Sequence, residues 1–176
     1  MPAKSVWLSL SNAINQLSEI RESLKSFAKN GRVRIIDTNE AMNTVEGSGR
    51  YLLRPPLVGR DASLLHNSLK ERGFASLVVC REPKTKLGLC PVVSLGSGVT
   101  VRVQVEEPSN KDQPTCAWFD YALGELGQHV LDMTDKQDGL ERQLDYLIAH
   151  FPSISSYKVA YQKAALICGL IQEAKD

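Results

Sequence analysis

The sequence predicts an α+β domain built on a small, mainly antiparallel five-stranded sheet, with an N-terminal helix, one inserted helix and a three-helix C-terminal segment. Three observations predict this class: an amphipathic N-terminal stretch, a strictly alternating valine segment at 99–105, and leucine stripes at helical spacing after residue 115. The length of 176 residues fits one domain, and the apolar share of 43% and charged share of 23% are ordinary for a globular chain.

The first predicted element is an amphipathic helix from about Ser5 to Lys29, which Asn30-Gly31 ends. Its apolar residues recur three and four positions apart: Leu10, Ala13, Leu17, Ile20, Leu24 and Phe27. We expect this stripe to pack on the domain's own sheet. The same spacing fits about two and a half heptads of a coiled coil, so a dimer seam along this helix is the alternative.

Five strands are predicted, at 32–37, 51–53, 76–81, 87–95 and 99–105. A polar loop is expected over 38–49, and the inserted helix runs from Asp61, its N-terminal cap, to Arg72 before Gly73. The last strand carries valines on one face and polar residues on the other, which indicates a half-buried antiparallel strand. Gly96-Ser97-Gly98 favours a hairpin turn.

After a polar linker at 106–114, three helices are predicted over 115–133, 139–150 and 157–174. These elements divide the chain into an α+β sheet domain at 1–107 and a helical segment at 115–176. We expect the helical segment to pack on the sheet within one structural domain.

The order of helices and strands over residues 5–132 resembles the longin, roadblock and profilin-like arrangement, in which helices pack on a five-stranded antiparallel sheet. The resemblance consists of element order, without a shared residue motif, so no functional residue is carried over. It implies a module for protein interaction or dimerisation, and related topologies serve as ligand sensors.

Positive charge is concentrated in the middle of the chain. Residues 50–86 carry eight Lys/Arg and three Asp/Glu, whereas residues 87–176 carry seven and twelve. Six cations of this basic segment are candidate ligand- or anion-binding residues: Arg50, Arg54, Arg60, Arg81, Lys84 and Lys86. Nucleic acid is a possible partner but is not favoured, because Tyr51 and Phe74 are the only rings nearby for base stacking.

The cysteines and histidines show no spacing that is typical of a catalytic or metal-binding site. A hairpin turning about Thr85 would place Cys80 and Cys90 opposite each other, although two buried, reduced thiols are the favoured interpretation. The four cysteines form no CxxC pair, which predicts a reducing, cytoplasmic location. Neither the cysteines nor the three histidines show a ligand or triad spacing, so no metal, cofactor or catalytic residue is predicted.

Two aromatic residues at the start of the first C-terminal helix, Trp118 and Tyr121, form a candidate interaction patch. No apolar run is long enough to span a membrane, and Met1–Leu10 lacks a signal-peptide pattern. The sequence therefore favours a non-enzymatic protein-interaction or adaptor module, with a homodimer as one form. The alternatives are anionic-ligand or nucleic-acid binding through segment 50–86, and an enzyme whose site residues are dispersed in sequence.

Overall fold

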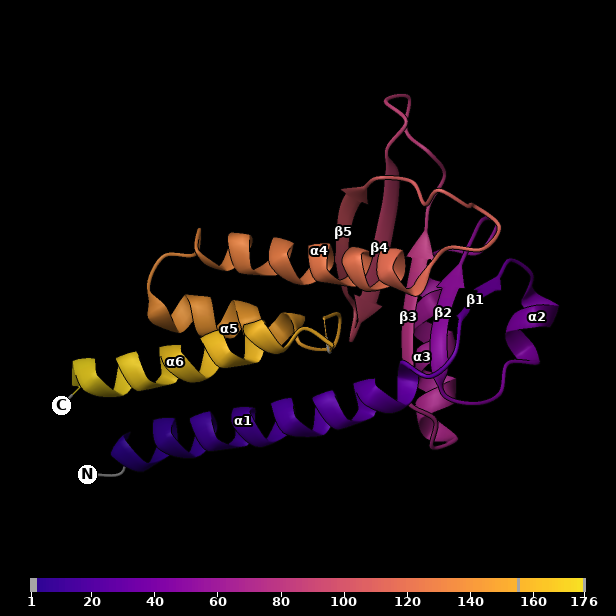
Figure 1. The fold of residues 1–176 in the computed structure, drawn as a ribbon. Helices are drawn as coiled ribbons and strands as arrows, with labels where there is room; N and C mark the ends of the chain where they lie inside the picture. Colours follow the sequence, from indigo (N-terminus) through magenta and orange to yellow (C-terminus); the bar gives the residue numbers. More distant parts are fainter. Residues whose placement is uncertain (1–2, 155, 176) are drawn as a thin grey trace.

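Five strands form one sheet in the order β1-β2-β3-β4-β5 in the computed structural model, which describes residues 3–154 and 156–175 (Figure 1). The strands are β1 (Val33–Ile36), β2 (Gly49–Leu53), β3 (Ser76–Arg81), β4 (Cys90–Gly96) and β5 (Val99–Val105). Each strand overlaps a predicted one, so the five-stranded sheet is confirmed.

The sheet is mixed, and the prediction of a mainly antiparallel sheet is wrong. β1 pairs with β2 and β2 with β3 in parallel, whereas the β3–β4 and β4–β5 pairs are antiparallel. A parallel pair needs a long crossover, which residues 37–48 and 54–75 supply. All five residues of β2 are buried, as expected of a parallel strand covered on both faces. The longin-like arrangement therefore does not describe this sheet.

Six helices are present in the described ranges. They are α1 (Ala3–Ala28), α2 (Asn39–Asn43), α3 (Gly59–Glu71), α4 (Cys116–Thr134), α5 (Leu140–His150) and α6 (Lys158–Lys175). Short α2 lies in the predicted loop and is capped by Thr38, whose Oγ1 accepts a hydrogen bond from the Ala41 N–H at 3.1 Å. The other five helices match predicted ones, although α3 begins before its predicted cap because Asp61 accepts from the Val58 N–H at 2.8 Å.

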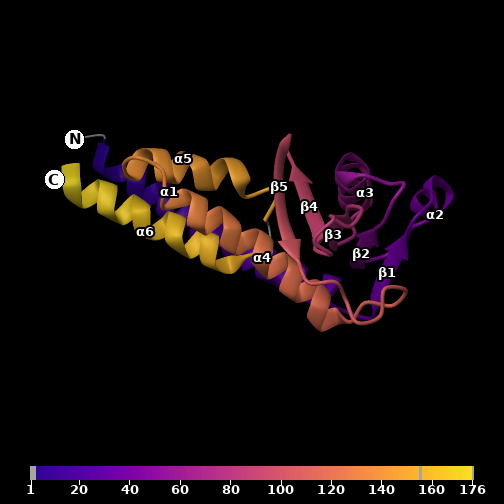
Figure 2. The ribbon, with the colours of Figure 1, turned by 90° about the horizontal axis from the view of Figure 1, so that it is seen from above.

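Two apolar clusters cover the two faces of the sheet. On one face, Tyr51 packs in a cluster with Leu69 of α3. On the other face, Leu52 belongs to the main core with Phe119 of α4 and Tyr161 of α6. Figure 2 shows α3 and the long helices on opposite sides of the sheet. The main core therefore joins the strands to helices from both ends of the chain.

The valine strand follows its predicted alternation. In β5 the valines are buried or half-buried, and Thr100, Arg102 and Gln104 are exposed. The turn before it is also confirmed, since β4 ends at Gly96 and β5 begins at Val99. Both turn residues have positive φ, 49° at Ser97 and 80° at Gly98, as a two-residue type I′ hairpin requires.

Helices α1 and α6 lie side by side and antiparallel along an arm that extends from the sheet (Figures 1 and 2). Their contact is the most extensive between two helices. Lys25, near the end of α1, donates to the Ser156 carbonyl at 2.8 Å, and Lys175, at the end of α6, lies over the Trp7 ring. Ser11 Oγ donates to the Ala165 carbonyl between these ends.

The stripe predicted for α1 is only partly buried, and it packs mainly on α6 and only in part on β2 and β3 of the sheet. Leu10 and Leu17 border the core, but Ile20 and Phe27 are 57% and 62% exposed. The buried side is rotated toward α6, where Ile14 and Ser18 are enclosed. Helix α1 therefore has a wider apolar arc than its own domain covers.

Two glycines of α4 provide a test of the packing between α4 and the start of α6. A Cβ on Gly127 would lie 2.1 Å from the Tyr157 ring, whereas one on Gly124 would meet nothing within 4 Å. We expect Gly127→Ala to lower the free energy of unfolding by about 1–3 kcal/mol through overpacking. Gly124→Ala is the matched control and should raise it by roughly 0.5–1 kcal/mol, because alanine favours the helix. Urea denaturation measures both, and equal effects would contradict the packing described.

Candidate functional site

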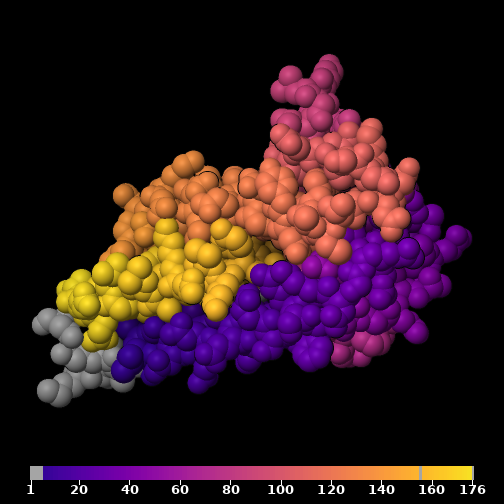
Figure 3. Space-filling view, viewed as in Figure 1, coloured from indigo at the N-terminus to yellow at the C-terminus, as the bar shows by residue number. Residues whose placement is uncertain are grey.

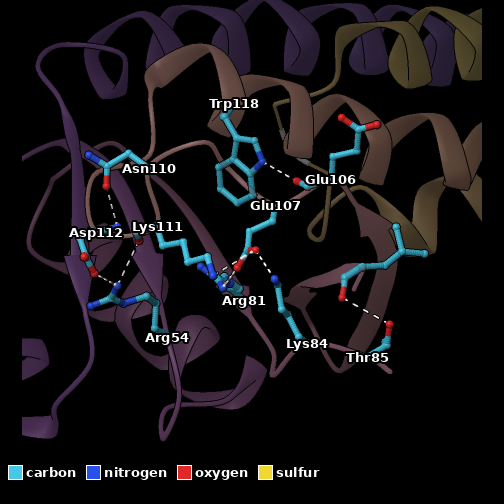
Figure 4. Close-up of polar contacts among 11 residues, drawn as sticks. Arg54, Arg81, Lys84, Thr85, Glu106, Glu107, Asn110, Lys111, Asp112 and Trp118 are labelled. Carbon is cyan, nitrogen blue, oxygen red and sulfur yellow. Dashed lines mark hydrogen bonds and ion pairs between the residues drawn. The ribbon is translucent and has the colours of Figure 1, made fainter. Parts of the chain in front are cut away.

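Two of the predicted anion-binding cations, Arg81 and Lys84, share one carboxylate near the long hairpin (Figure 4). Arg81 donates to Glu107 Oε1 at 2.8 Å, Lys84 pairs with Oε2, and Lys111 adds a contact of 3.4 Å. The hydrogen bond from Lys84 is the main cause that holds the pKa of Glu107 below its ordinary value. Arg81 and Lys84 are therefore paired within the protein, and Lys86 on the exposed tip has no ion pair among the described residues.

Arg50 and Arg54 also contact carboxylates. Arg50 is 5% exposed, makes two hydrogen bonds of 3.2 Å to Asp120 of α4, and donates to the Lys29 carbonyl at 2.6 Å. It thereby links β2, α4 and the end of α1. Arg54 donates to Asp37 at 2.9 Å and reaches Asp112 at 3.4 Å. These contacts give both arginines a structural role.

Arg60, the remaining member of the predicted set, is exposed on α3 and has no ion pair in the described part of the chain. The six cations are therefore spread over β2, α3, β3 and the hairpin. The structure brings Arg81 and Lys84 together at Glu107 and leaves Arg60 and Lys86 in solvent. The hairpin tip protrudes from the molecular surface (Figure 3), and Leu87 at its end is 85% exposed.

Cys80 and Cys90 do not face each other, so the predicted register is wrong. Cys80 pairs with Val93, and Cys90 pairs with Val105. A shift of three residues in the hairpin turns a side chain to the other face of the sheet. Accordingly, Cys80 belongs to the cluster under α3 and Cys90 to the main core.

Thiol chemistry tests this register. Burial raises the pKa of Cys80 to about 12 and also raises the pKa of Cys90 and of Cys168, so these thiols stay protonated at mildly alkaline pH. We expect only Cys116, which is partly exposed, to react rapidly with a disulfide reagent in the native protein. All four thiols should react after unfolding. A Cys80–Cys90 disulfide in oxidised native protein, detected by peptide mapping, would contradict the assigned faces.

A partly enclosed cavity of about 180 Å³ lies where α1, α3 and β3 meet. Its walls are apolar for the most part and include Leu24, Ala28, Phe74, Ala75 and Leu77. Its charged and polar lining residues come from distant parts of the chain: Arg21, Lys25, His66, Lys70, Ser76 and Ser156. Among the described residues, no aspartate or glutamate lines it. We call it the α1–α3 pocket.

His66 is the one histidine among the lining residues of this pocket. Its Nδ1 lies 3.0 Å from Ser76 Oγ. Burial lowers the pKa of His66, and the positive charges of Arg21 and Lys70 lower it further. The imidazole is therefore neutral at neutral pH. When Nδ1 accepts from the serine hydroxyl, Nε2 carries the ring proton and is a hydrogen-bond donor.

Arg21 crosses from α1 toward α6 beside the pocket. Its positive charge opposes the effect of burial, which raises the pKa of Tyr161 to about 12. The Nε atom of Arg21 is buried and has no hydrogen-bond partner, and no carboxylate forms an ion pair with this arginine in the described ranges. The sequence prediction missed Arg21 because it lies outside the basic segment, within a stretch interpreted only as an amphipathic helix.

Only part of the predicted aromatic patch is exposed to solvent. Trp118 Nε1 donates to the Glu106 carbonyl at 2.8 Å and the ring borders the main core, whereas Tyr121 is 46% exposed. His150 stacks on Tyr146, and His129 is exposed. No group of three or more potential metal ligands is found among the described side chains.

Exposed apolar side chains recur along the outer face of α1. We define the outer α1 face by seven residues: Val6, Ala13, Gln16, Ile20, Ser23, Leu24 and Phe27. Val6, Ile20, Leu24 and Phe27 are each at least 42% exposed. None of the seven side chains is charged. A row of this length on one helix is the feature that most resembles a protein-binding surface.

Comparisons of the chain with protein-family models, with curated proteins and with solved structures find no match. In the described part of the chain, no helix combines the length and the apolar character needed to cross a membrane. The structure therefore defines an α+β fold, and its surfaces and cavities are the features that bear on function.

Proposed function

We propose that this protein is an interaction module that self-associates through the outer α1 face, forming a weak antiparallel homodimer. The observation that carries the proposal is the exposure of apolar residues at regular helical spacing along one side of α1. Exposed apolar patches of this kind are typical of protein–protein interfaces. A second copy of the chain would cover Val6, Ile20 and Phe27 with equally apolar residues.

The sequence of the face fits a two-fold axis near its middle. Residues 6 and 27 lie equally far from position 16.5, as do residues 13 and 20. An antiparallel pair of α1 helices therefore places Val6 against the partner's Phe27 and Ala13 against the partner's Ile20. Each large side chain meets a smaller one. A parallel pair would instead oppose two alanines and two phenylalanines, leaving a gap at one point and crowding at another.

The charge pattern also favours a second copy. A self-complementary interface places each residue near its own kind, so charges on it would repel. The outer α1 face carries serine and glutamine beside its apolar residues. The nearest acidic residue, Glu19, lies outside the face, beyond the edge that Ser23 and Gln16 form. Two copies thus meet without a like-charge contact.

The size of the face limits the strength of the dimer. From Val6 to Phe27 the helix rises roughly 30 Å, and with a width of about 10 Å it offers roughly 300 Å² per subunit. The total of about 600 Å² is below the ~1,000 Å² of a stable interface. The dimer is therefore reversible and forms at high protein concentration.

Nucleic-acid or anion binding by the surface of segment 50–86 is the weaker alternative. Four of its six candidate cations, Arg50, Arg54, Arg81 and Lys84, already pair with carboxylates. Each of these pairs would have to open before the cation met a phosphate. Retention on a phosphate-rich matrix at low salt would favour this alternative.

Ile20→Asp tests the proposal. The side chain is 57% exposed, so the variant should fold with nearly the same thermal stability, but two aspartates would enter the apolar interface. Sedimentation over a concentration series should show association of the native chain and only monomer for the variant. Leu166→Asp on α6, where the leucine is 64% exposed, is the matched control and should associate like the native chain. A native chain that stays monomeric at every concentration contradicts the proposal.

A further inference from the structure

The α1–α3 pocket has a composition suited to one class of small molecule. Apolar side chains form most of its wall, and the charged groups around it, Arg21, Lys25 and Lys70, are all cationic. Its volume of about 180 Å³ is far above the roughly 10–15 Å³ that one water needs. It is smaller than the ~300–1,000 Å³ of sites for drug-sized ligands. The pocket thus fits a small organic molecule with an apolar body.

The three cations differ in whether they already form ion pairs or hydrogen bonds within the protein. Lys25 donates to the Ser156 carbonyl and lies 3.5 Å from Glu22. Lys70 is exposed at the rim, and Arg21 is half-buried with its Nε atom enclosed; neither has an ion pair among the described residues. A buried guanidinium nitrogen without a hydrogen-bond partner is costly and is uncommon in native proteins. An anionic oxygen beside Arg21 would supply the missing acceptor.

We infer that the α1–α3 pocket binds a small amphipathic anion, with its carboxylate or phosphate group between Arg21, His66 and Lys70 and its apolar body against Leu24, Phe74 and Leu77. Arg21 supplies charge-assisted hydrogen bonds, and Lys70 adds positive charge at the rim. His66 donates from Nε2 while Ser76 holds Nδ1. A second, smaller cavity of about 30 Å³ shares His66, Ser76, Leu77 and Ser156 and extends the space toward β4.

The inference is independent of the dimer. The anion-binding groups line the cavity between α1, α3 and β3, whereas Ile20 and Phe27 are on the outer α1 face. Leu24 belongs to both features, so a substitution at Leu24 would affect both. The Ile20→Asp monomer should bind the same anion as the native chain, which separates the failure of one proposal from the failure of the other.

Calorimetric titration with octanoate and with octyl phosphate tests the site and distinguishes the two head groups. Saturable binding is expected for at least one of them. Octanamide, which has the same chain without the charge, and inorganic phosphate, which lacks the chain, should each bind at least tenfold more weakly. Octanamide binding equal to that of octanoate and octyl phosphate would overturn the anionic class, and absence of saturable binding by all probes would overturn the site.

Arg21→Gln should weaken binding of the better probe by roughly tenfold to a hundredfold, because a charge-assisted hydrogen bond is lost. Arg60→Gln is the matched control: it removes the same charge from an exposed arginine of α3 outside the pocket and should change binding less than twofold. Equal loss in both variants would show nonspecific charge attraction and overturn the assignment.

The imidazole of His66 gives a readout that does not depend on a variant folding. Burial lowers the pKa of His66, and the charges of Arg21 and Lys70 lower it further, so a bound anion should raise that pKa by offsetting their charge. The ring signals of His66, followed by NMR against pH with and without the better probe, measure the shift. The exposed ring of His129 is the internal control. An unchanged pKa of His66 at saturation would place the anion elsewhere.

Discussion

The antiparallel contact between α1 and α6 determines which surfaces of this protein remain available. It joins the first and last helices of the chain, and contacts such as Lys25 with the Ser156 carbonyl fix which side of α1 is buried. The buried side includes Ile14 and Ser18, so Ile20 and Phe27 are left on the outside. Because burial of apolar area drives association, a helix with apolar residues on both sides favours a second contact.

The cations of the central segment contrast with the exposed apolar residues of α1, because most of these cations already have partners within the fold. Most cations of the central segment hold elements together: Arg50 links β2, α4 and the end of α1, and Arg81 and Lys84 fix the base of the hairpin to Glu107. Removing Asp120 would leave the buried charge of Arg50 uncompensated, which is destabilising, so these residues are constrained by the fold. Arg21 differs because, among the described residues, no carboxylate pairs with it although its Nε atom is buried, and this is the charge that the proposed anion would balance.

Local patterns in the sequence predicted much of the secondary structure. The valine alternation of β5, the turn at Ser97-Gly98 and the leucine-rich C-terminal helices depend on neighbours in sequence and were predicted correctly. Strand direction, the register of Cys80, and the buried side of α1 depend on contacts between distant segments. The length of the crossovers between β1, β2 and β3 was the available signal for parallel pairing. The α1–α3 pocket was not predictable, because Arg21 and His66 meet only once α1 and α3 lie beside β3.

Cross-linking near the expected two-fold axis tests the central claim, that two outer α1 faces meet antiparallel, most directly. In a Cys116→Ser background, Gln16→Cys places one thiol close to position 16.5 on each helix, so a short bis-maleimide should link two copies efficiently. Val6→Cys should not link to itself, but a mixture with Phe27→Cys should give the mixed dimer. Self-linking of Val6→Cys that exceeds that of Gln16→Cys would indicate parallel helices, and no linking of any variant would contradict the contact.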